Sequence, residues 1–413
     1  MHICKYYAAD KNNNFVRIFR IFAGCHLSER QKLWADEFIY GSKMDRKEDF
    51  SRLEISLPAC LDNYKYFRSK LETSTKLLVL VKANAYGHGA VEFASLMVDA
   101  GADYLAVAYP VEGVELRDAG IKTPIMVLTA GTDFFNDIID NDLEPGIPNL
   151  TSLKALCEVL SEGGVTDFPI HIKLDTGMHR LGFMSEEIEE LSDFLKNCNE
   201  VKVKSVYSHL AAADDAENDD FTHSQASLFV ENADKLAEAI GYKPLYHLLN
   251  SAGIERFPQY QFDMVRLGIG IYGVSAIPGN RLSPVASFKC KVLQIKSLKP
   301  GDGTIGYGRR GQIAPEGTVI ATIPVGYADG VDRHLSCGKG YFTVNGHRVP
   351  TIGNICMDMS MLDVTGLDVK VGDTVTIFGE DPSISDLAEV LGTIPYEILT
   401  SVPRRIERVV IGA

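Results

Sequence analysis

Short apolar segments recur eight times between about residues 77 and 273, and most are followed by a segment long enough to form a helix. Each apolar segment has the length of a buried strand, whereas the intervening segments, such as "AVEFASLMVDAG", carry a helical pattern. Strands that alternate with helices usually pair in parallel, which indicates a parallel sheet. The eight segments begin at Leu77, Tyr104, Pro124, Leu143, Ile170, Val203, Tyr246 and Met264.

The number of strand–helix units constrains the fold class. Eight units over roughly 200–250 residues have the size of a closed (β/α)8 barrel. We therefore predict an α/β fold with an N-terminal (β/α)8 barrel of the TIM type over residues 51–282. A doubly wound open sheet is the alternative, and it is less favoured because eight repeats would overfill it.

Two further regions differ from the barrel segment in composition. After about Leu282, Val-, Ile- and Thr-rich runs are broken by Gly, Pro, Asn and Asp, and "VNGH" is a strong hairpin signal. These features predict a C-terminal all-β domain over residues 283–413. Residues 1–50 carry a polar "DKNNN" run and the only tryptophan, and we interpret them as an N-terminal extension of unknown role.

Composition excludes several classes of protein. The balance of 46% hydrophobic and 23% charged residues is that of a globular enzyme, and a net charge of −14 argues against a nucleic-acid partner. No segment approaches the ~20 apolar residues of a membrane helix. The eight cysteines include no CxxC pair, so we predict neither a metal site nor a disulfide framework, and we expect a cytoplasmic protein.

One lysine stands out at the end of the first barrel strand. The segment "VKANAYGHGA" (Val81–Ala90) follows a buried-strand pattern, so Lys82 is expected to point into the mouth of the barrel. A desolvated lysine loses its proton and can act as a nucleophile or form a Schiff base. A strand-end lysine that extends into solvent is the commoner case, but the polar, glycine-rich turn after Lys82 favours a site that approaches a phosphate.

The segment "IHIKLDTGMHRLG" supplies a second group of candidates. Side chains alternate with a period of two along a strand, which places His171, Lys173 and Asp175 on one face. Such groups inside a barrel form either a structural network or part of a catalytic site, and the sequence does not decide between these roles. Arg180 follows on the loop, where it can bind a carboxylate or polarise an oxyanion.

Later strand ends carry candidates for a phosphate site. His209 lies at the end of the predicted strand in "SVYSHL", although a lone histidine is more often structural. Ser251 in "HLLNSAG" suits a phosphate held by a hydroxyl group and backbone amides. The segment "MVRLGIGIYG" adds Arg266, Gly268 and Ile269, at the place where many barrels bind phosphate. Tight strand packing is the alternative explanation for the glycine.

The predicted C-terminal domain contains three residues of interest in glycine-rich turns. "GTIGYGRR", "IPVGYADGVDRHL" and "GNICMDMSMLDV" contain Tyr307, Tyr327 and Met357. Taken singly, a tyrosine in a loop is most often a surface residue, so these positions become informative only in combination with the barrel motifs.

In combination, the segments resemble the bacterial alanine racemases over about Arg52 to Val409. The motifs are specific as a set because eight of them occur in the family's order, and only the N-terminal extension falls outside the match. They are "VKANAYGHG", "KLDTGMHRLG", "SHLAAAD", "NSAG", "VRLGIGIYG", "GYGRR", "GYADG" and "NICMDM".

The resemblance implies a pyridoxal 5'-phosphate cofactor that forms an internal aldimine with Lys82. It also implies that His209 lies against the cofactor ring, that Arg266 faces the pyridine nitrogen, and that Arg180 lies near the phenolic oxygen and the substrate carboxylate. Lys173 is the candidate for the family's carbamylated lysine. The residues implied around the phosphate are Tyr86, Ser251, Gly268, Ile269 and Tyr327.

The reaction implied by the resemblance is the interconversion of L-alanine and D-alanine through an external aldimine, which supplies D-alanine for peptidoglycan. Lys82 serves as the base on the D face and Tyr307 as the base on the L face. Arg266 does not readily give up a proton, so the ring nitrogen stays unprotonated and decarboxylation or transamination is disfavoured. In this family, Tyr307 and the Met357 backbone reach into the other subunit, which implies a homodimer with shared active sites.

The chain departs from the family pattern at three places, one of which is His179, and only the departure at Pro403 and Arg404 bears on specificity. Gly353-Asn354 stands where relatives often have Gly-Arg, and Pro403 and Arg404 stand where many have a tyrosine that closes the substrate entrance. A broader-specificity amino-acid racemase or a serine racemase of the same fold is therefore the alternative. A non-catalytic, cofactor-handling barrel protein is disfavoured, because such proteins lack the domain that carries Tyr307 and Met357.

Overall fold

The computed structural model describes residues 8–9, 15–16, 50–280 and 282–412. The chain divides into two compact units, Met1–Asp49 and Phe50–Ala413. In the first unit, β1 (Ala8–Ala9) pairs antiparallel with β2 (Phe15–Val16). The rest of the predicted N-terminal extension lies outside the described residues.

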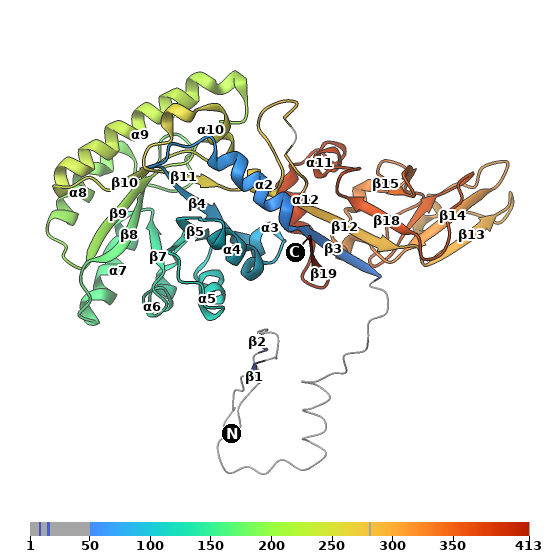
Figure 1. The fold of residues 1–413 in the computed structure, drawn as a ribbon, viewed down its shortest axis with the longest axis horizontal. Coiled ribbons are helices and arrows are strands. Elements are labelled where there is room, and N and C mark those ends of the chain that lie inside the picture. Colours follow the sequence, from blue (N-terminus) through green and yellow to red (C-terminus); the bar gives the residue numbers. More distant parts are fainter. Residues whose placement is uncertain (1–7, 10–14, 17–49, 281, 413) are drawn as a thin grey trace, which may run out of the picture. The chain divides into compact units, whose positions relative to one another are not determined.

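An eight-stranded parallel sheet forms the barrel (Figure 1), in the order β10-β9-β8-β7-β6-β5-β4-β11. The backbone N–H groups of Asp263 and Arg266 donate to the carbonyl oxygens of Tyr246 and Leu249, at 3.1 and 2.9 Å, and bridge the gap between β11 and β10. The sheet is therefore nearly closed, and all eight predicted strands are confirmed. They are β4 (Lys76–Leu80), β5 (Tyr104–Val107), β6 (Ile125–Val127), β7 (Glu144–Ile147), β8 (Phe168–Lys173), β9 (Val201–Tyr207), β10 (Leu245–His247) and β11 (Met264–Leu267).

Helices cover the outside of these strands (Figure 1). Because side chains fill the barrel interior and helices cover its outer face, a strand such as β5 is buried at every position. No helix in the described part of the chain is both long and apolar enough to cross a membrane. The helices around the barrel are α2 (Leu57–Arg68), α4 (Ala90–Asp99), α5 (Pro110–Asp118), α6 (Phe135–Asp140), α7 (Leu150–Glu162), α8 (Ile188–Lys196), α9 (Asp219–Ile240) and α10 (Ser251–Arg256).

The C-terminal part contains two sheets, one of six strands in the order β16-β15-β18-β12-β3-β19 and one of three in the order β13-β14-β17. The predicted hairpin in "VNGH" is confirmed, because Asn345 and Gly346 have φ of 49° and 77° between β15 and β16. The strands are β12 (Ala286–Lys291), β13 (Gln294–Leu298), β14 (Thr318–Ile323), β15 (Tyr341–Val344), β16 (His347–Pro350), β17 (Ser360–Asp363), β18 (Thr374–Phe378) and β19 (Glu407–Ile411).

Strand β3 (Ser51–Ser56) precedes the barrel in sequence but belongs to the six-stranded sheet, where it pairs antiparallel with β12 and parallel with β19. This part of the chain also contains two helices that the sequence patterns did not indicate, α11 (Ile384–Leu391) and α12 (Pro395–Ser401). The domain boundary expected at residue 282 stays a prediction.

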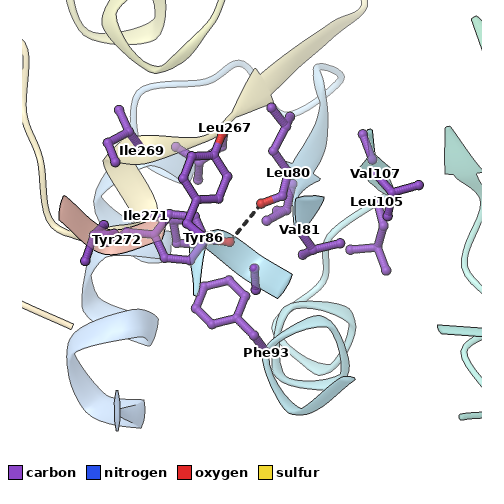
Figure 2. Close-up of a cluster of buried hydrophobic side chains, with 14 of the residues drawn as sticks. Leu80, Val81, Tyr86, Phe93, Leu105, Val107, Leu267, Ile269, Ile271 and Tyr272 are labelled. Carbon is purple, nitrogen blue, oxygen red and sulfur yellow. Dashed lines mark hydrogen bonds between the residues drawn. The ribbon is translucent and has the colours of Figure 1, made fainter. Parts of the chain in front are cut away.

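Buried apolar side chains cluster around Leu80 and Val81, at the end of β4 (Figure 2). The Tyr272 hydroxyl donates a hydrogen bond of 2.9 Å to the backbone oxygen of Leu80. The rings of Tyr272 and Phe93 stack with centroids 4.8 Å apart. Because these side chains are packed and buried, the backbone leading to Lys82 has little freedom to move.

Candidate active site

Lys82 follows β4 after one intervening residue, Val81, and begins a left-handed turn rather than an ordinary helix. Left-handed backbone costs roughly 1–2 kcal/mol per residue for side chains with a Cβ atom, so a run of four such residues needs support from its surroundings. Such strain concentrates at functional sites. The φ angles are 52°, 55°, 51° and 52° at Ala83, Asn84, Ala85 and Tyr86.

Hydrogen bonds from neighbouring elements hold this turn. The backbone N–H of Ala83 donates to Glu112 Oε1 at 2.6 Å, which ties the turn to α5. The backbone N–H of Ala90 donates to Asn84 Oδ1 at 3.0 Å, which ties it to the start of α4. The turn motif recognised in the sequence therefore serves to fix the position of Lys82.

Cationic side chains surround the Lys82 amine. Burial lowers the pKa of Lys82, and the nearby positive charge of Arg180 lowers it further, whereas Glu112 raises it. Burial, followed by Arg180 and Arg266, lowers the pKa of Lys173 to about 8. The mouth of the barrel thus favours a neutral, nucleophilic lysine and attracts an anionic ligand.

The predicted phosphate-binding residues of the barrel come together at the ends of β4, β10 and β11. Ser251 Oγ accepts hydrogen bonds from the backbone N–H groups of Gly268 and Gly270, at 2.9 and 3.1 Å. A Cβ atom at position 268 would lie 3.0 Å from the Tyr86 hydroxyl and 3.8 Å from Ser251 Oγ, so glycine is needed there for close packing. Ile269 is buried beside them, with 6% of its surface exposed.

Arg266 lies inside the barrel with 3% of its surface exposed and donates to several acceptors. Its Nη2 donates to the backbone oxygens of Ser208 and Leu248, at 2.5 and 2.8 Å, and its Nη1 to the backbone oxygen of His247 at 3.0 Å. Burial lowers the pKa of Arg266 to about 10, so it remains charged at neutral pH. Arg266 Nη2 also lies 3.3 Å from Nδ1 of His209, whose pKa is well below its ordinary value because of burial and the charge of Arg266.

A chain of buried polar groups continues from Arg266 across the barrel interior. Arg266 Nη1 lies 3.1 Å from His247 Nδ1, and His247 Nε2 lies 2.7 Å from Ser205 Oγ. Ser205 Oγ lies 2.6 Å from His171 Nδ1, and His171 Nε2 lies 2.9 Å from Glu144 Oε2. Because the guanidinium can only donate and the carboxylate accepts, each group donates to the next toward Glu144. This places His171 in a structural network, one of its two predicted roles.

The loop after β8 presents Arg180. The period-two pattern predicted that Asp175 lies on the strand, and this prediction is wrong. Strand β8 ends at Lys173, so Asp175 lies in the loop that follows. Asp175 Oδ1 accepts hydrogen bonds from the backbone N–H groups of Gly177 and His179, at 2.9 and 3.0 Å. Arg180 is exposed, and within residues 50–280 and 282–412 it forms no ion pair. Its guanidinium is therefore available for a carboxylate ligand.

Among the described residues, no hydrogen bond, ion pair or ring contact joins the three candidates of the C-terminal part to Lys82 of the same chain. Tyr307 is 74% exposed in a turn between β13 and β14, which lie at the end of the C-terminal part remote from the barrel (Figure 1). Its backbone oxygen accepts from Asn354 Nδ2 at 2.8 Å. No hydrogen bond or ring contact in the described residues joins Tyr307 to the barrel.

Tyr327 and Met357 lie close to each other. The backbone N–H of Tyr327 donates to the oxygen of Cys356, and that of Ala328 donates to the oxygen of Met357, both at 3.0 Å. A Cβ atom at Gly326 would meet these two carbonyl oxygens at 2.2 and 2.4 Å, so this close approach requires glycine. Both side chains are exposed.

Sequence reasoning missed several residues that shape the site. Tyr396 of α12 packs against Tyr86 with ring centroids 5.9 Å apart, and Glu115 forms an ion pair of 3.1 Å with Arg404, which the sequence had already indicated. His247 carries the polar chain from Arg266, and its place at the end of a buried strand is the signal that could have identified it. Tyr396 has no comparable signal, because its contact depends on how the C-terminal part packs on the barrel.

Comparison with known proteins assigns the chain to a family. Residues 55–276 match the alanine racemase N-terminal domain, and residues 285–410 match the alanine racemase C-terminal domain. Alanine racemase 1 of Clostridium acetobutylicum is 37% identical over 367 residues, which cover 85% of this chain and 94% of that protein.

Solved structures agree with this match. The alanine racemase of Clostridium difficile 630 superposes with a TM-score of 0.82 and 34% identity, over 88% of this chain and 96% of that one. The alanine racemase of Bartonella henselae, solved with covalently bound pyridoxal phosphate, gives a TM-score of 0.80 and 29% identity, over 88% and 100% of the two chains. The chain therefore belongs to the alanine racemase family of enzymes.

Proposed function

We propose that the protein interconverts L-alanine and D-alanine, with pyridoxal phosphate bound covalently to Lys82, and that it supplies D-alanine for peptidoglycan. One observation carries the proposal: a lysine with a lowered pKa, held by a strained turn, lies at the same barrel mouth as the buried cluster of Tyr86, Ser251 and Gly268. The cytoplasm is the proposed location, and the six cysteines within the described residues are all free, as expected in a reducing compartment.

The residues at the barrel mouth fit this cofactor. The Tyr86 and Ser251 hydroxyls suit a phosphate, and the absence of a side chain at Gly268 leaves the backbone open to close approach. Arg266 can donate to a ring nitrogen, and the neutral ring of His209 beside it can lie against an aromatic face. Tyr327 would complete the phosphate site.

The chemistry then depends on two bases. When bound, pyridoxal phosphate withdraws electrons from the substrate Cα and so acidifies the α-proton. Arg180 orients the substrate through its carboxylate, with the Met357 backbone near the same group. Lys82 removes or returns the α-proton on the D face, and Tyr307 of the partner subunit does so on the L face. Two bases on opposite faces avoid the need for one base to cross the substrate plane.

The turn that carries Tyr307 lies at the end of the C-terminal part remote from the barrel, and the side chains of Tyr327 and Met357 are exposed, which supports a homodimer with shared active sites. Their exposure is what residues that enter a second subunit require: 74% at Tyr307, 45% at Tyr327 and 54% at Met357. Large exposed apolar side chains that are clustered commonly mark interaction surfaces.

Arg266 provides the test of reaction type. An arginine at the ring nitrogen holds its proton, so we expect racemisation of alanine without release of carbon dioxide or pyruvate. Arg266→Glu places a group there that can give up a proton, and we expect kcat for racemisation to fall by about 10²-fold or more. Arg266→Lys is the control that keeps a positive charge, and circular dichroism checks the fold. Carbon dioxide or pyruvate as the main wild-type product would contradict the assignment.

Lys173 is proposed to carry a carbamate. Its neutral amine would attack carbon dioxide, forming an N–C bond and releasing a proton, and the resulting anion would lie among Lys82, Arg180 and Arg266. Only the neutral amine reacts, and the pKa of Lys173 is lowered to about 8 by burial and these charges, so modification should increase as the pH rises through 8. Carbon-13 NMR with labelled bicarbonate should detect a carbamate that is absent in Lys173→Arg. Failure to detect it at pH 9 would rule out the modification.

The range of substrates is a further property to test. Positions 403 and 404 hold no tyrosine, and in many relatives a tyrosine there closes the substrate entrance. We expect serine to be a secondary substrate, with a kcat/KM within ~10⁴-fold of that for alanine, since an apolar pocket discriminates weakly against one added hydroxyl. Pro403→Tyr should reduce activity on serine more than on alanine. A larger discrimination in the wild-type protein would show that other groups, such as Tyr396 or the Arg404–Glu115 pair, restrict size.

A further inference from the structure

Two thiols and a carboxylate converge on the outside of the barrel, in a place that the proposed reaction does not use. Cys157 Sγ in α7 lies 3.1 Å from Cys198 Sγ, in the connection from α8 to β9. Cys198 Sγ lies 3.1 Å from Glu200 Oε2. Within the described residues, this is the one group of three His, Cys, Asp or Glu side chains whose ligand atoms all lie within 4.8 Å of one another.

The backbone around two of these residues is fixed. The N–H of Asp167 donates to the oxygen of Asn199 at 3.0 Å, and the N–H of Phe168 donates to the oxygen of Glu200 at 2.9 Å. These bonds tie the connection to the start of β8. Cys157 is buried on the inner face of α7, with 8% of its surface exposed. The three groups are therefore held together before any ligand binds, which reduces the ordering cost of binding.

The groove that contains the cluster is acidic. It has a volume of about 730 Å³, and its lining includes Glu158, Glu162 and Asp193 in addition to Cys157, Cys198 and Glu200. Lys154 also lines it, but the Lys154 ammonium lies 4.0 Å from the carboxylate of Glu190. The excess of carboxylates attracts cations and offers further oxygen ligands.

We propose that Cys157, Cys198 and Glu200 bind a Zn²⁺ ion, with water or Glu158 as the fourth ligand. Thiolate sulfur combined with a carboxylate is a ligand set that suits zinc, whereas magnesium and calcium prefer oxygen alone. At Zn–S distances of about 2.3 Å, tetrahedral geometry places two sulfurs about 3.8 Å apart, so the thiols need only separate slightly by side-chain rotation. Binding replaces two thiol protons, which are released to solvent.

The position of the site indicates a structural role. Cys198 and Glu200 precede β9, and the residues bonded to this connection, Asp167 and Phe168, lie at the start of β8, so the ion would lie at the N-terminal ends of the strands. In barrels of this type the catalytic face is at the opposite, C-terminal ends. Zinc would thus link α7 to the α8–β9 connection and stabilise the fold without contacting the substrate.

Zinc titration of the full-length holoenzyme tests the proposal. Protein stripped with chelator and kept in a phosphine reductant should bind one Zn²⁺ per chain, measured by competition with a chromophoric chelator. Cys157→Ser and Cys198→Ser should each weaken binding by about 100-fold and Glu200→Gln by about tenfold. Cys337→Ser, which alters an exposed cysteine outside the groove, should bind as the wild type does. Absence of stoichiometric binding, or equal affinity in the Cys157→Ser/Cys198→Ser double variant, would overturn the proposal.

Two further measurements separate a zinc site from a redox pair. Zinc should protect Cys157 and Cys198, but not Cys337, from alkylation, and it should raise the Tm of the wild type but not of the double variant. Racemisation should be unchanged by zinc in both proteins. If oxidised glutathione joins the two sulfurs as a disulfide at the same rate with and without saturating zinc, the ion does not occupy the thiols and the proposal is wrong.

Discussion

Replacing Lys82 by alanine is expected to lower kcat for alanine racemisation by at least about 10⁴-fold, the largest effect of any single change considered. In the proposed mechanism, this substitution removes both the amine that binds the cofactor and the base of one face. The half-buried position and lowered pKa of Lys82 suit its amine to both roles. Racemisation is measured by the loss of optical rotation, starting separately from L-alanine and D-alanine.

Covalent attachment has its own measurement. Borohydride reduction of the wild-type holoenzyme should fix the cofactor on the peptide that contains Lys82, as identified by mass spectrometry. Lys173→Ala is the matched control, because it removes a second lysine of the same mouth and should leave the label on Lys82. A label on any other lysine would overturn the assignment.

Removal of the Tyr307 hydroxyl is expected to have the second largest effect. Tyr307→Phe should lower racemisation by about 10²- to 10⁴-fold, because proton transfer on the L face loses its base. Exchange of the D-alanine α-proton with solvent should be partly retained, since Lys82 acts on that face. Proton NMR in deuterated water follows this exchange, and equal loss of exchange from both enantiomers would contradict the assignment of one base to each face.

The shared site can be tested by subunit mixing. Lys82→Ala and Tyr307→Phe subunits that exchange freely should yield about half heterodimers, each with one intact and one doubly damaged site, and so restore about a quarter of wild-type activity. A mixture of Lys82→Ala with the Lys82→Ala/Tyr307→Phe double variant contains no intact site and serves as the control. If the first mixture remains inactive although mass spectrometry detects heterodimers, each subunit builds its own site.

The barrel is predictable from the sequence because strands such as β5 are buried on both faces and read as short apolar runs, although β9 exposes Lys202 and Lys204. The segments between these runs repeat their apolar residues with the helical period rather than the strand period. For this reason the sequence predicts the position of all eight strands from β4 to β11 correctly. The sequence did not show that β3 leaves the barrel segment and pairs with β12 and β19, because its partners lie more than 200 residues further along the chain.

Within the candidate site, the sequence by itself determined which residues stand at the strand ends: Lys82, Ser251, Arg266 and Gly268 follow from motif order and strand position. The tertiary structure alone decided what they contact. The left-handed turn after Lys82 is held in place by Glu112, which accepts from the Ala83 N–H, and by Asn84, whose Oδ1 accepts from the Ala90 N–H of α4. The path from Arg266 to Glu144 joins residues of five strands, β11 to β7. The meeting of Cys157 with Cys198 is likewise a contact across 41 residues. The local order of apolar and polar residues indicates where a strand lies and how far it is buried. Contacts between distant segments depend instead on the packing of the whole barrel.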